Sequence, residues 1–372
     1  MDKSKTHKAE PGIVAPQACH TWALGIATYN RRDVLMQCLK LAADQTRPPA
    51  EIVVVDASKD WQATRDLVMA QLAPRYPDIR WQYEPATRPS AAVQRNQAAA
   101  LCTADVVFLF DDDSFMYPDA AHELMKLYDA DVDQVVAGVA AALASRPPAQ
   151  AADEKAVQEI EAARVAPTVK HYSRIARLVR RVLNADHMFV PYDADFPSHP
   201  VPASLAGRHV GRRRLMAGMT MTARRAWVVQ ERFSELLADR GPEDSDLSYR
   251  LSRRGAVLTA LDARVFHVGS PSGRFSSFSR EALGYLGPIV LHRLYSTDLK
   301  RSRREQRSML RRRMLVGLIK DIQGKEYGLP RFKGIRFALK HMDRVLKMTP
   351  EEIEAWYPAF QQDVMAGDAL RA

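Results

Sequence analysis

The sequence predicts an α/β fold with a mixed, mainly parallel sheet flanked by helices, a helical insertion and a helical, basic C-terminal region. Three observations predict it. Apolar, β-branched runs alternate with stretches of helical periodicity from residue 22 to 143, which is the spacing of βαβ units. The alternation breaks between about 145 and 210. Beyond about residue 278 the pattern is helical, basic and poor in strand-like runs.

The first part of the core alternates regularly. Strands are expected at residues 22–28, 51–55, 79–83 and 106–110, and helices at 33–43, 61–72, 91–102 and 118–128. Short polar segments, called polar corners below, follow three of these strands, at residues 28–30, 56–58 and 111–113. Because ligands bind at the carboxyl ends of parallel strands, these corners should converge at one edge of the sheet.

The second part is less regular. A strand is expected at 135–143, followed by an insertion at about 145–210 that contains a helix at 156–183, interrupted at Pro167. The core resumes with a strand at 216–222, a helix at 242–252 and two short strands, 257–261 and 265–268, around a turn. The expected divisions are an N-terminal tail (1–19), an α/β domain (20–277) and the helical C-terminal region (278–372).

Composition describes a globular protein. Of 372 residues, 47% are hydrophobic and 26% charged, and no uninterrupted apolar run of membrane-spanning length occurs. The first ten residues are polar and lack the apolar core of a secretory signal, so a cytoplasmic protein is expected. Three widely spaced cysteines indicate neither a disulfide framework nor a zinc cluster.

The net charge of +10 is concentrated in one region. Residues 300–347 contain 16 Lys or Arg against 4 Asp or Glu, an excess of 12 that exceeds the whole-chain value. The excess positive charge therefore lies in the C-terminal region, which is expected to bind an anionic partner.

Asp111, Asp112 and Asp113 follow a buried strand and are the strongest candidates for chemistry. Adjacent carboxylates repel one another and are costly to desolvate without a cation. Their oxygens suit Mg²⁺ or Mn²⁺, and alternate residues of an extended segment share a face, so Asp111 and Asp113 can serve one site. The alternative is a solvated acidic turn.

Other candidates are weaker when each is taken alone. Asp56 could accept hydrogen bonds from a nucleobase or ribose, or only form a turn. Arg95 could bind a pyrophosphate, or be a surface arginine. Glu243 and Asp244 could provide a general base, or cap a helix through its dipole. His267, beside a Gly/Ser loop with Arg274, could be a metal ligand or structural.

Taken in order, these segments resemble the inverting nucleotide-sugar transferases of glycosyltransferase family 2, which have the GT-A fold. The resemblance is carried by the segments ALGIATYNR (23–31), IVVVDAS (52–58), QRNQA (94–98), VFLFDDDS (107–114), GPEDSDLSYRL (241–251) and HVGS (267–270). Single motifs are weak, but their order is specific.

The resemblance implies a role for each candidate. The nucleotide sugar would contact these residues: Thr28, Tyr29, Asn30, Asp56, Arg95, Asp111 and Asp112. The divalent metal, Mn²⁺ or Mg²⁺, would be held by Asp111, Asp113 and His267. Asp244 would be the catalytic base, assisted by Glu243. The sugar, of hexosyl type, would pass with inversion to a hydroxyl of a saccharide or lipid-linked saccharide, in surface polysaccharide or glycolipid synthesis.

Two basic segments suggest contact with an anionic membrane surface. Lys170, Arg174, Arg177 and Arg181 share one helix face, and the C-terminal region combines arginines at 303–304 and 311–313 with apolar residues at 315–319. This predicts a cytoplasmic protein that lies peripherally on the inner face of the membrane. The alternative is solvated helix faces packed on the core.

Three other functions stay open at this point. Arg-rich helices also suit nucleic acid, but no recognition motif is present and the acidic triplet argues against it, so nucleic acid is not the expected partner. A nucleotidyltransferase would need a Gly-rich phosphate loop after the first strand, and residues 28–31 contain no glycine. A non-catalytic scaffold would not need its acidic residues.

Overall fold

The predicted alternation of strands and helices is present in the computed structural model, which describes residues 19–151, 196–197, 199–237, 241–269 and 276–367. The first part of the chain contains β1 (Trp22–Thr28), α1 (Arg32–Ala43), β2 (Glu51–Asp56), α2 (Trp61–Gln71), β3 (Arg80–Pro85), α3 (Ala91–Leu101), β4 (Val106–Phe108), β5 (Ser114–Met116), α4 (Ala120–Ala130) and β6 (Val136–Leu143). The second part of the core contains β7 (Val210–Arg212), β8 (Met221–Arg224), α7 (Arg225–Glu231), α8 (Glu243–Ser252) and β9 (Ala256–His267).

These strands form one nine-stranded mixed sheet in the order β3-β2-β1-β4-β8-β6-β9-β5, with β7 paired to β9. The strands β3, β2, β1 and β4 are parallel, as is the β6–β9 pair. Strand β8 runs antiparallel between β4 and β6. The carboxyl ends of β1, β2 and β4 therefore share one edge, as predicted.

Helices cover both faces of the sheet because buried side chains alternate along its strands. Leu24 and Val54 pack on one face with residues of α1, α2 and α4. Ala23 and Val53 pack on the other face with residues of α3, α7 and α8. This period-two alternation on strands and the helical stripes above them produce a three-layer core.

Several details differ from the sequence prediction. The fourth strand ends at Phe108 rather than 110, and Asp111 then forms an isolated bridge with Ala27. The strand expected at 216–222 begins only at Met221, after a short 3₁₀ turn. The two strands expected at 257–261 and 265–268 are one strand, β9. The residues expected to form a turn lie instead at a register shift in its pairing with β6, opposite Ala141 and Ala142. The sequence prediction does not include strands β5 and β7 or helix α7.

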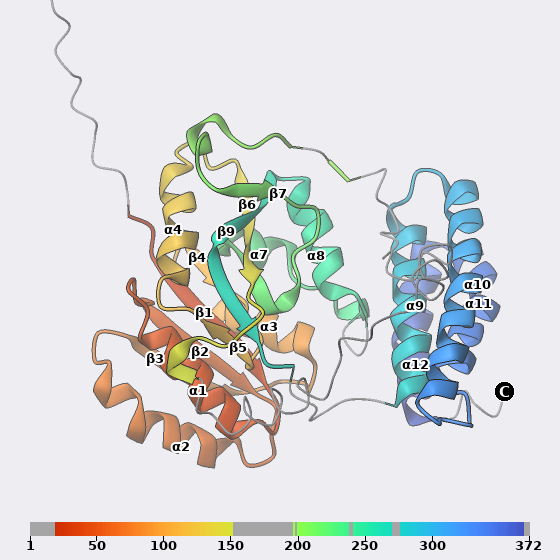
Figure 1. The fold of residues 1–372 in the computed structure, drawn as a ribbon, viewed down its shortest axis with the longest axis horizontal. Helices are drawn as coiled ribbons and strands as arrows, with labels where there is room; N and C mark the ends of the chain where they lie inside the picture. The colour runs from red at the N-terminus through yellow and green to blue at the C-terminus, as the bar shows by residue number, and fades with distance from the viewer. Residues whose placement is uncertain (1–18, 152–195, 198, 238–240, 270–275, 368–372) are drawn as a thin grey trace, which may run out of the picture.

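The C-terminal region is helical, as predicted. It contains α9 (Ser277–Tyr295), α10 (Leu299–Gln323), α11 (Pro330–Lys347) and α12 (Pro350–Ala366), which stand side by side next to the α/β part in Figure 1. Its apolar core includes Leu286 and Tyr357 and extends to Leu237 and Tyr249 of the α/β part. Tyr295 Oη donates a 2.6 Å hydrogen bond to Asp246 of α8. The helices therefore support α8 directly.

The helix expected at 156–183, with its basic face, lies outside the described residues. Within the described part of the chain, Cys19, Cys38 and Cys102 are free thiols. In that same part, the long helices are too polar to qualify as membrane spans.

Candidate active site

The three predicted polar corners meet at the carboxyl edge of the parallel strands. Thr28, at the end of β1, donates from Oγ1 to Asp112 Oδ2 over 2.7 Å. Gln94 Nε2 donates to the carbonyl oxygens of Thr28 and Val55, each at 2.8 Å. A side chain of α3 thus ties the ends of β1 and β2 together beside the aspartates.

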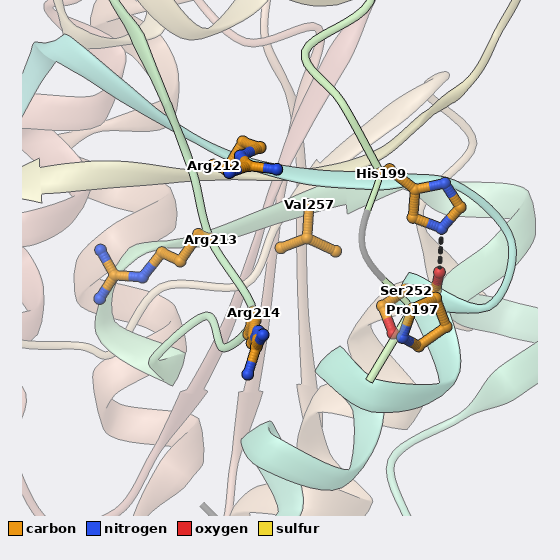
Figure 2. A pocket seen from close by; sticks show the side chains of 7 residues that line it. All are labelled: Pro197, His199, Arg212, Arg213, Arg214, Ser252 and Val257. Carbon is orange, nitrogen blue, oxygen red and sulfur yellow. Dashed lines mark hydrogen bonds between the residues drawn. The ribbon is translucent and has the colours of Figure 1, made fainter. Parts of the chain in front are cut away.

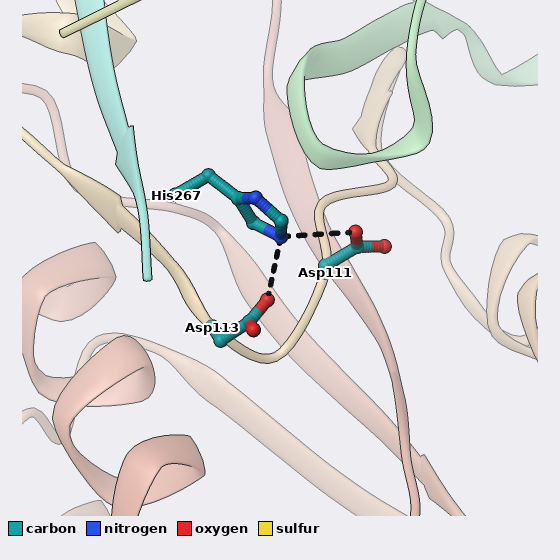
Figure 3. A group of neighbouring side chains, drawn as sticks. All are labelled: Asp111, Asp113 and His267. Atoms are coloured by element: carbon teal, nitrogen blue, oxygen red, sulfur yellow. Dashed lines mark ion pairs between the residues drawn. The ribbon is translucent and has the colours of Figure 1, made fainter. Parts of the chain in front are cut away.

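Asp111, Asp113 and His267 form a cluster in which one ligand atom of each lies within 4.8 Å of the others (Figure 3). His267 Nε2 is 3.1 Å from Asp113 Oδ1 and 3.8 Å from Asp111 Oδ2. The Asp113 side chain is only 2% exposed, whereas Asp111 and His267 remain partly open to solvent. Two carboxylates and one imidazole are a suitable ligand set for Mn²⁺ or Mg²⁺.

Strand β5 explains how His267 reaches the aspartates. It pairs antiparallel with the end of β9 and places Ser114 opposite His267. The next residue, Val268, donates its backbone N–H to the Asp113 carbonyl over 3.0 Å. The hydrogen bond from His267 to Asp113 raises the pKa of the imidazole, which is the direction expected beside carboxylates.

Asp112 is not a member of this cluster. Its carboxylate accepts hydrogen bonds from Thr28 and, over 2.9 Å, from Arg31 Nη1. Burial raises the pKa of Asp112 to about 6, against the opposing effects of Arg31 and Thr28. Arg31 Nη1 also lies 3.6 Å from Asp113 Oδ2, so one guanidinium contacts both acids.

Arg95, on α3, joins the aspartates to the acidic helix α8. Its Nη2 donates to Asp111 Oδ1 over 2.5 Å, and its Nη1 donates to Glu243 Oε1 over 3.1 Å. Burial alone would lower the pKa of Arg95, but the nearby carboxylates raise it overall. Arg95 is 5% exposed, so its position is fixed by these partners and by close packing against Gly218.

Glu243 and Asp244 occupy the first turn of α8, where the helix dipole favours acids. Asp244 Oδ1 accepts from the Ser245 N–H at 2.7 Å, and Oδ2 accepts from the Gly218 N–H at 3.3 Å. Burial, and then the charge of Asp244, raises the pKa of Glu243, and burial also raises the pKa of Asp244. Raised carboxylate pKa values of this kind are typical of acid–base sites.

A cavity of about 350 Å³ opens beside the aspartates and holds three of the predicted nucleotide contacts. It is lined by Thr28, Asn30, Arg31, Arg32, Asp33, Leu35, Asp56, Ser58, Asp60 and Thr64. Asp56 is buried here and accepts from Ser58 N, Ser58 Oγ and Tyr83 Oη at 2.5–2.7 Å. The turn-forming role of Asp56 is therefore present, and a direct contact with a nucleotide stays a prediction.

Comparison with known proteins finds a family match over part of the chain. Residues 24–188 match the family described as glycosyl transferase family 2. The chain carries a family 2 glycosyltransferase domain. No match was found among curated protein sequences.

Two solved structures are similar to this glycosyltransferase. The mannosyltransferase PcManGT from Pyrobaculum calidifontis, solved in complex with GDP-Man and Mn²⁺, has a TM-score of 0.50 at 14% identity, covering 93% of this chain and 89% of its own. TarS from S. aureus has a TM-score of 0.43 at 14% identity, covering 79% of this chain and 43% of its own. The first similarity confirms the expected GT-A fold, and the second is too weak to bear on it.

The glycosyltransferase thus brings the predicted metal ligands together and places Arg95 between them and the predicted base. Tyr29 is 50% exposed and is not among the residues lining the cavity. Arg274 lies outside the described residues. The sequence analysis assigns no role to Arg31, although Arg31 lies within the first motif. It assigns none to Gly218 either, because the importance of Gly218 comes from its packing against Arg95, which no local sequence pattern reveals.

Proposed function

We propose that this glycosyltransferase moves a sugar, with inversion, from a nucleotide diphosphate sugar to a hydroxyl of a saccharide or lipid-linked saccharide. One observation carries the proposal: a single buried arginine, Arg95, bridges the candidate metal cluster and the acidic pair on α8. A donor diphosphate at the cluster would then lie next to a base on α8.

The donor side is supported by charge and by space. The pair of carboxylates Asp111 and Asp113, with His267, would hold Mn²⁺ or Mg²⁺, and this ion would neutralise the charge that develops on the leaving diphosphate. Arg31 lines the neighbouring cavity while contacting Asp112 and Asp113, so it joins the nucleotide pocket to the cluster. The base and ribose of the nucleotide would occupy that cavity.

The acceptor side is supported by the carboxylates of α8. Asp244 would take the proton from the acceptor hydroxyl as its oxygen bonds to the anomeric carbon and the bond from that carbon to the diphosphate oxygen breaks. One displacement of this kind inverts the anomeric configuration. The raised pKa of Asp244, which burial produces, brings the base closer to neutral pH.

Two substitutions test the assignment. Asp244→Asn should abolish transfer while leaving metal-dependent nucleotide binding intact, whereas Asp113→Ala should abolish both. The anomeric configuration of the product, read by proton NMR, should be opposite to that of the donor. Transfer that survives Asp244→Asn would move the base elsewhere, and a retained configuration would refute single displacement.

We also propose that residues 20–277 are the transferase domain and that residues 278–372 dock it on an anionic membrane surface. Helix α10 presents one face on which exposed residues recur at helical spacing, with Arg304 and Arg311 followed by Leu315, Ile319 and Ile322. The three apolar side chains are 51%, 43% and 60% exposed. Lipid headgroups would meet the basic half and acyl chains the apolar half.

A basic cavity of about 570 Å³ lies along the first half of α10. It is lined by Lys300, Arg303, Arg304, Arg307, Ser308, Arg311 and Arg312. Arg303 and Arg307 are partly neutralised by Asp343. Cosedimentation with phosphatidylglycerol vesicles should weaken about 30-fold in Arg304→Gln/Arg311→Gln, at about 1 kcal/mol per charge.

The apolar half of the α10 face has its own test. The double variant Leu315→Asn/Ile319→Asn should also reduce vesicle binding, because it removes side chains that would enter the acyl-chain region of the membrane. Val132→Asn and Leu261→Asn, which change exposed apolar residues of the α/β part, are matched controls. If the controls weaken binding as much as the α10 variants, the membrane surface has been misplaced. Membrane docking would place the enzyme on the cytoplasmic face, where polysaccharide or glycolipid acceptors are built.

A further inference from the structure

A third cavity, of about 410 Å³, lies beside the short strand β7 (Figure 2), and the residues of the metal cluster are not among those that line it. It is lined by Pro197, His199, Arg212, Arg213, Arg214, Ser252 and Val257. Three consecutive arginines and a histidine thus surround one space, and no carboxylate is among the described residues that line it. The lining therefore favours an anionic ligand.

Arg212 and Arg213 have no carboxylate partner elsewhere in the described part of the chain. Arginines in this protein are otherwise often paired, as Arg95, Arg224 and Arg250 are. A guanidinium offers planar, forked donors that match phosphate oxygens in bidentate geometry. Arg212 and Arg213 together carry two positive charges, which is enough to balance a dianion.

Arg213 is held in a fixed position by neutral acceptors. Its Nε donates to the Leu215 carbonyl over 2.6 Å, and its Nη1 donates to Thr259 Oγ1 over 3.3 Å. Its second terminal nitrogen is not used in these bonds, and it can donate to a ligand.

The cavity is linked to the candidate base by two routes. Ser252, in its lining, ends α8, while Asp244 begins the same helix, about 12 Å away along its axis. The chain beyond Arg214 reaches Met216, whose N–H donates to Ser248 Oγ over 2.9 Å, and then Gly218, which donates to Asp244. A group held in this cavity would therefore lie at the C-terminal end of the helix whose first turn carries Asp244.

We infer that this cavity binds a phosphoryl group carried by the acceptor substrate. That the phosphoryl group belongs to the acceptor depends on the proposed function, whereas the binding of a phosphoryl group in this cavity does not. The bound phosphate would anchor the acceptor at one end of α8 while its hydroxyl meets Asp244 at the other.

Isothermal titration calorimetry with inorganic pyrophosphate tests the site. The titration is done in EDTA, so that the carboxylates of the metal cluster repel pyrophosphate. It uses an Arg304→Gln/Arg311→Gln background, so that the basic cavity of α10 contributes little. Arg213→Gln should raise the Kd about 10- to 100-fold, the effect of removing a charge-assisted hydrogen bond. The matched control is Arg208→Gln, which removes an exposed charge outside the cavity lining and should leave the Kd unchanged.

Unchanged affinity in Arg213→Gln and in Arg212→Gln, or no pyrophosphate binding by the parent protein, would overturn the inference. If Arg213→Gln does not fold, Arg212→Gln alone decides. Nucleotide binding with Mn²⁺ should be normal in these variants, which separates this site from the donor site. A prenyl diphosphate that binds more tightly than pyrophosphate identifies a lipid-linked source of the phosphate, and equal affinities identify a soluble one.

Discussion

Gly218 offers the sharpest test of the bridge formed by Arg95. A Cβ atom at this position would lie 2.5 Å from Arg95 Nη2, 3.0 Å from Cζ and 3.3 Å from Nη1. Non-bonded heavy atoms need about 3.5 Å, so Gly218→Ala forces the guanidinium to retreat by about 1 Å. The hydrogen bonds from Arg95 to Asp111 and Glu243 cannot both survive that movement.

The expected effect on catalysis is larger than the effect on stability. A displacement of about 1 Å in the active site can cost about 100-fold in rate. Overpacking of this size should lower the free energy of unfolding by about 1–3 kcal/mol. The variant is therefore expected to fold and to lose most of its kcat/KM.

The assay measures release of nucleoside diphosphate from the sugar nucleotide that stabilises the protein most, well below the Tm of each variant. Donor hydrolysis is sufficient for this readout, so the acceptor need not be known. Gly211→Ala is the matched control, because a Cβ there meets no atom within 4 Å. If Gly218→Ala keeps the wild-type kcat/KM, the Arg95 bridge has no catalytic importance.

Two further predictions concern the helical region. Gly287→Ala places a Cβ 2.5 Å from Pro242 Cδ, which precedes the acidic turn of α8, and should lower unfolding free energy by about 1–3 kcal/mol and reduce kcat. Gly284→Ala meets open space in the same helix, so urea unfolding should show a gain of up to about 1 kcal/mol, and equal effects would contradict the packing. Burial lowers the pKa of His292 from 6.5 to about 3, so the folded state excludes a proton that the unfolded state binds. Stability should therefore fall as pH drops below about 6.5, by about 2 kcal/mol at pH 5. His292→Gln should remove that loss and exposed His122→Gln should not, and a pH dependence that persists in His292→Gln would refute the assignment.

Much of the fold was predictable because buried strands and amphipathic helices have characteristic hydrophobic patterns in the sequence. The runs that became β1, β2 and β6 are apolar along nearly their whole length, as parallel or central strands must be. The sequence predicts two strands in place of β9, because Asp262 interrupts the apolar pattern. The sequence cannot distinguish a turn from a bulge there, since the difference depends on the partner strand β6.

The candidate site was predictable in its members but not in its connections. Asp111, Asp113 and His267 follow strands, and strand ends indicate a sheet edge. Strand β5, which delivers His267, has only three residues, too few to show a period. The partner of Arg95, Glu243, lies 148 residues away, so no local pattern could reveal their contact.

The cavity lined by Arg212, Arg213 and Arg214 shows the same limit. A run of three arginines is usually solvated, and only the folded structure places the run around a space with His199. The sequence alone located the basic excess in residues 300–347, which is correct for net charge but does not identify this smaller site.

Asp111, Asp113 and His267 are proposed to hold the metal that binds the donor diphosphate. A thermal-shift titration with nucleoside diphosphates, with and without Mn²⁺, tests it most directly. The structure predicts that one nucleotide stabilises the wild-type protein only with Mn²⁺, by about 2.7 kcal/mol at a hundredfold excess over Kd. Asp113→Ala should lose this response, and Asp133→Ala, at an exposed aspartate outside the cluster, should keep it. Nucleotide stabilisation that needs no metal, or that persists in Asp113→Ala, would contradict the account.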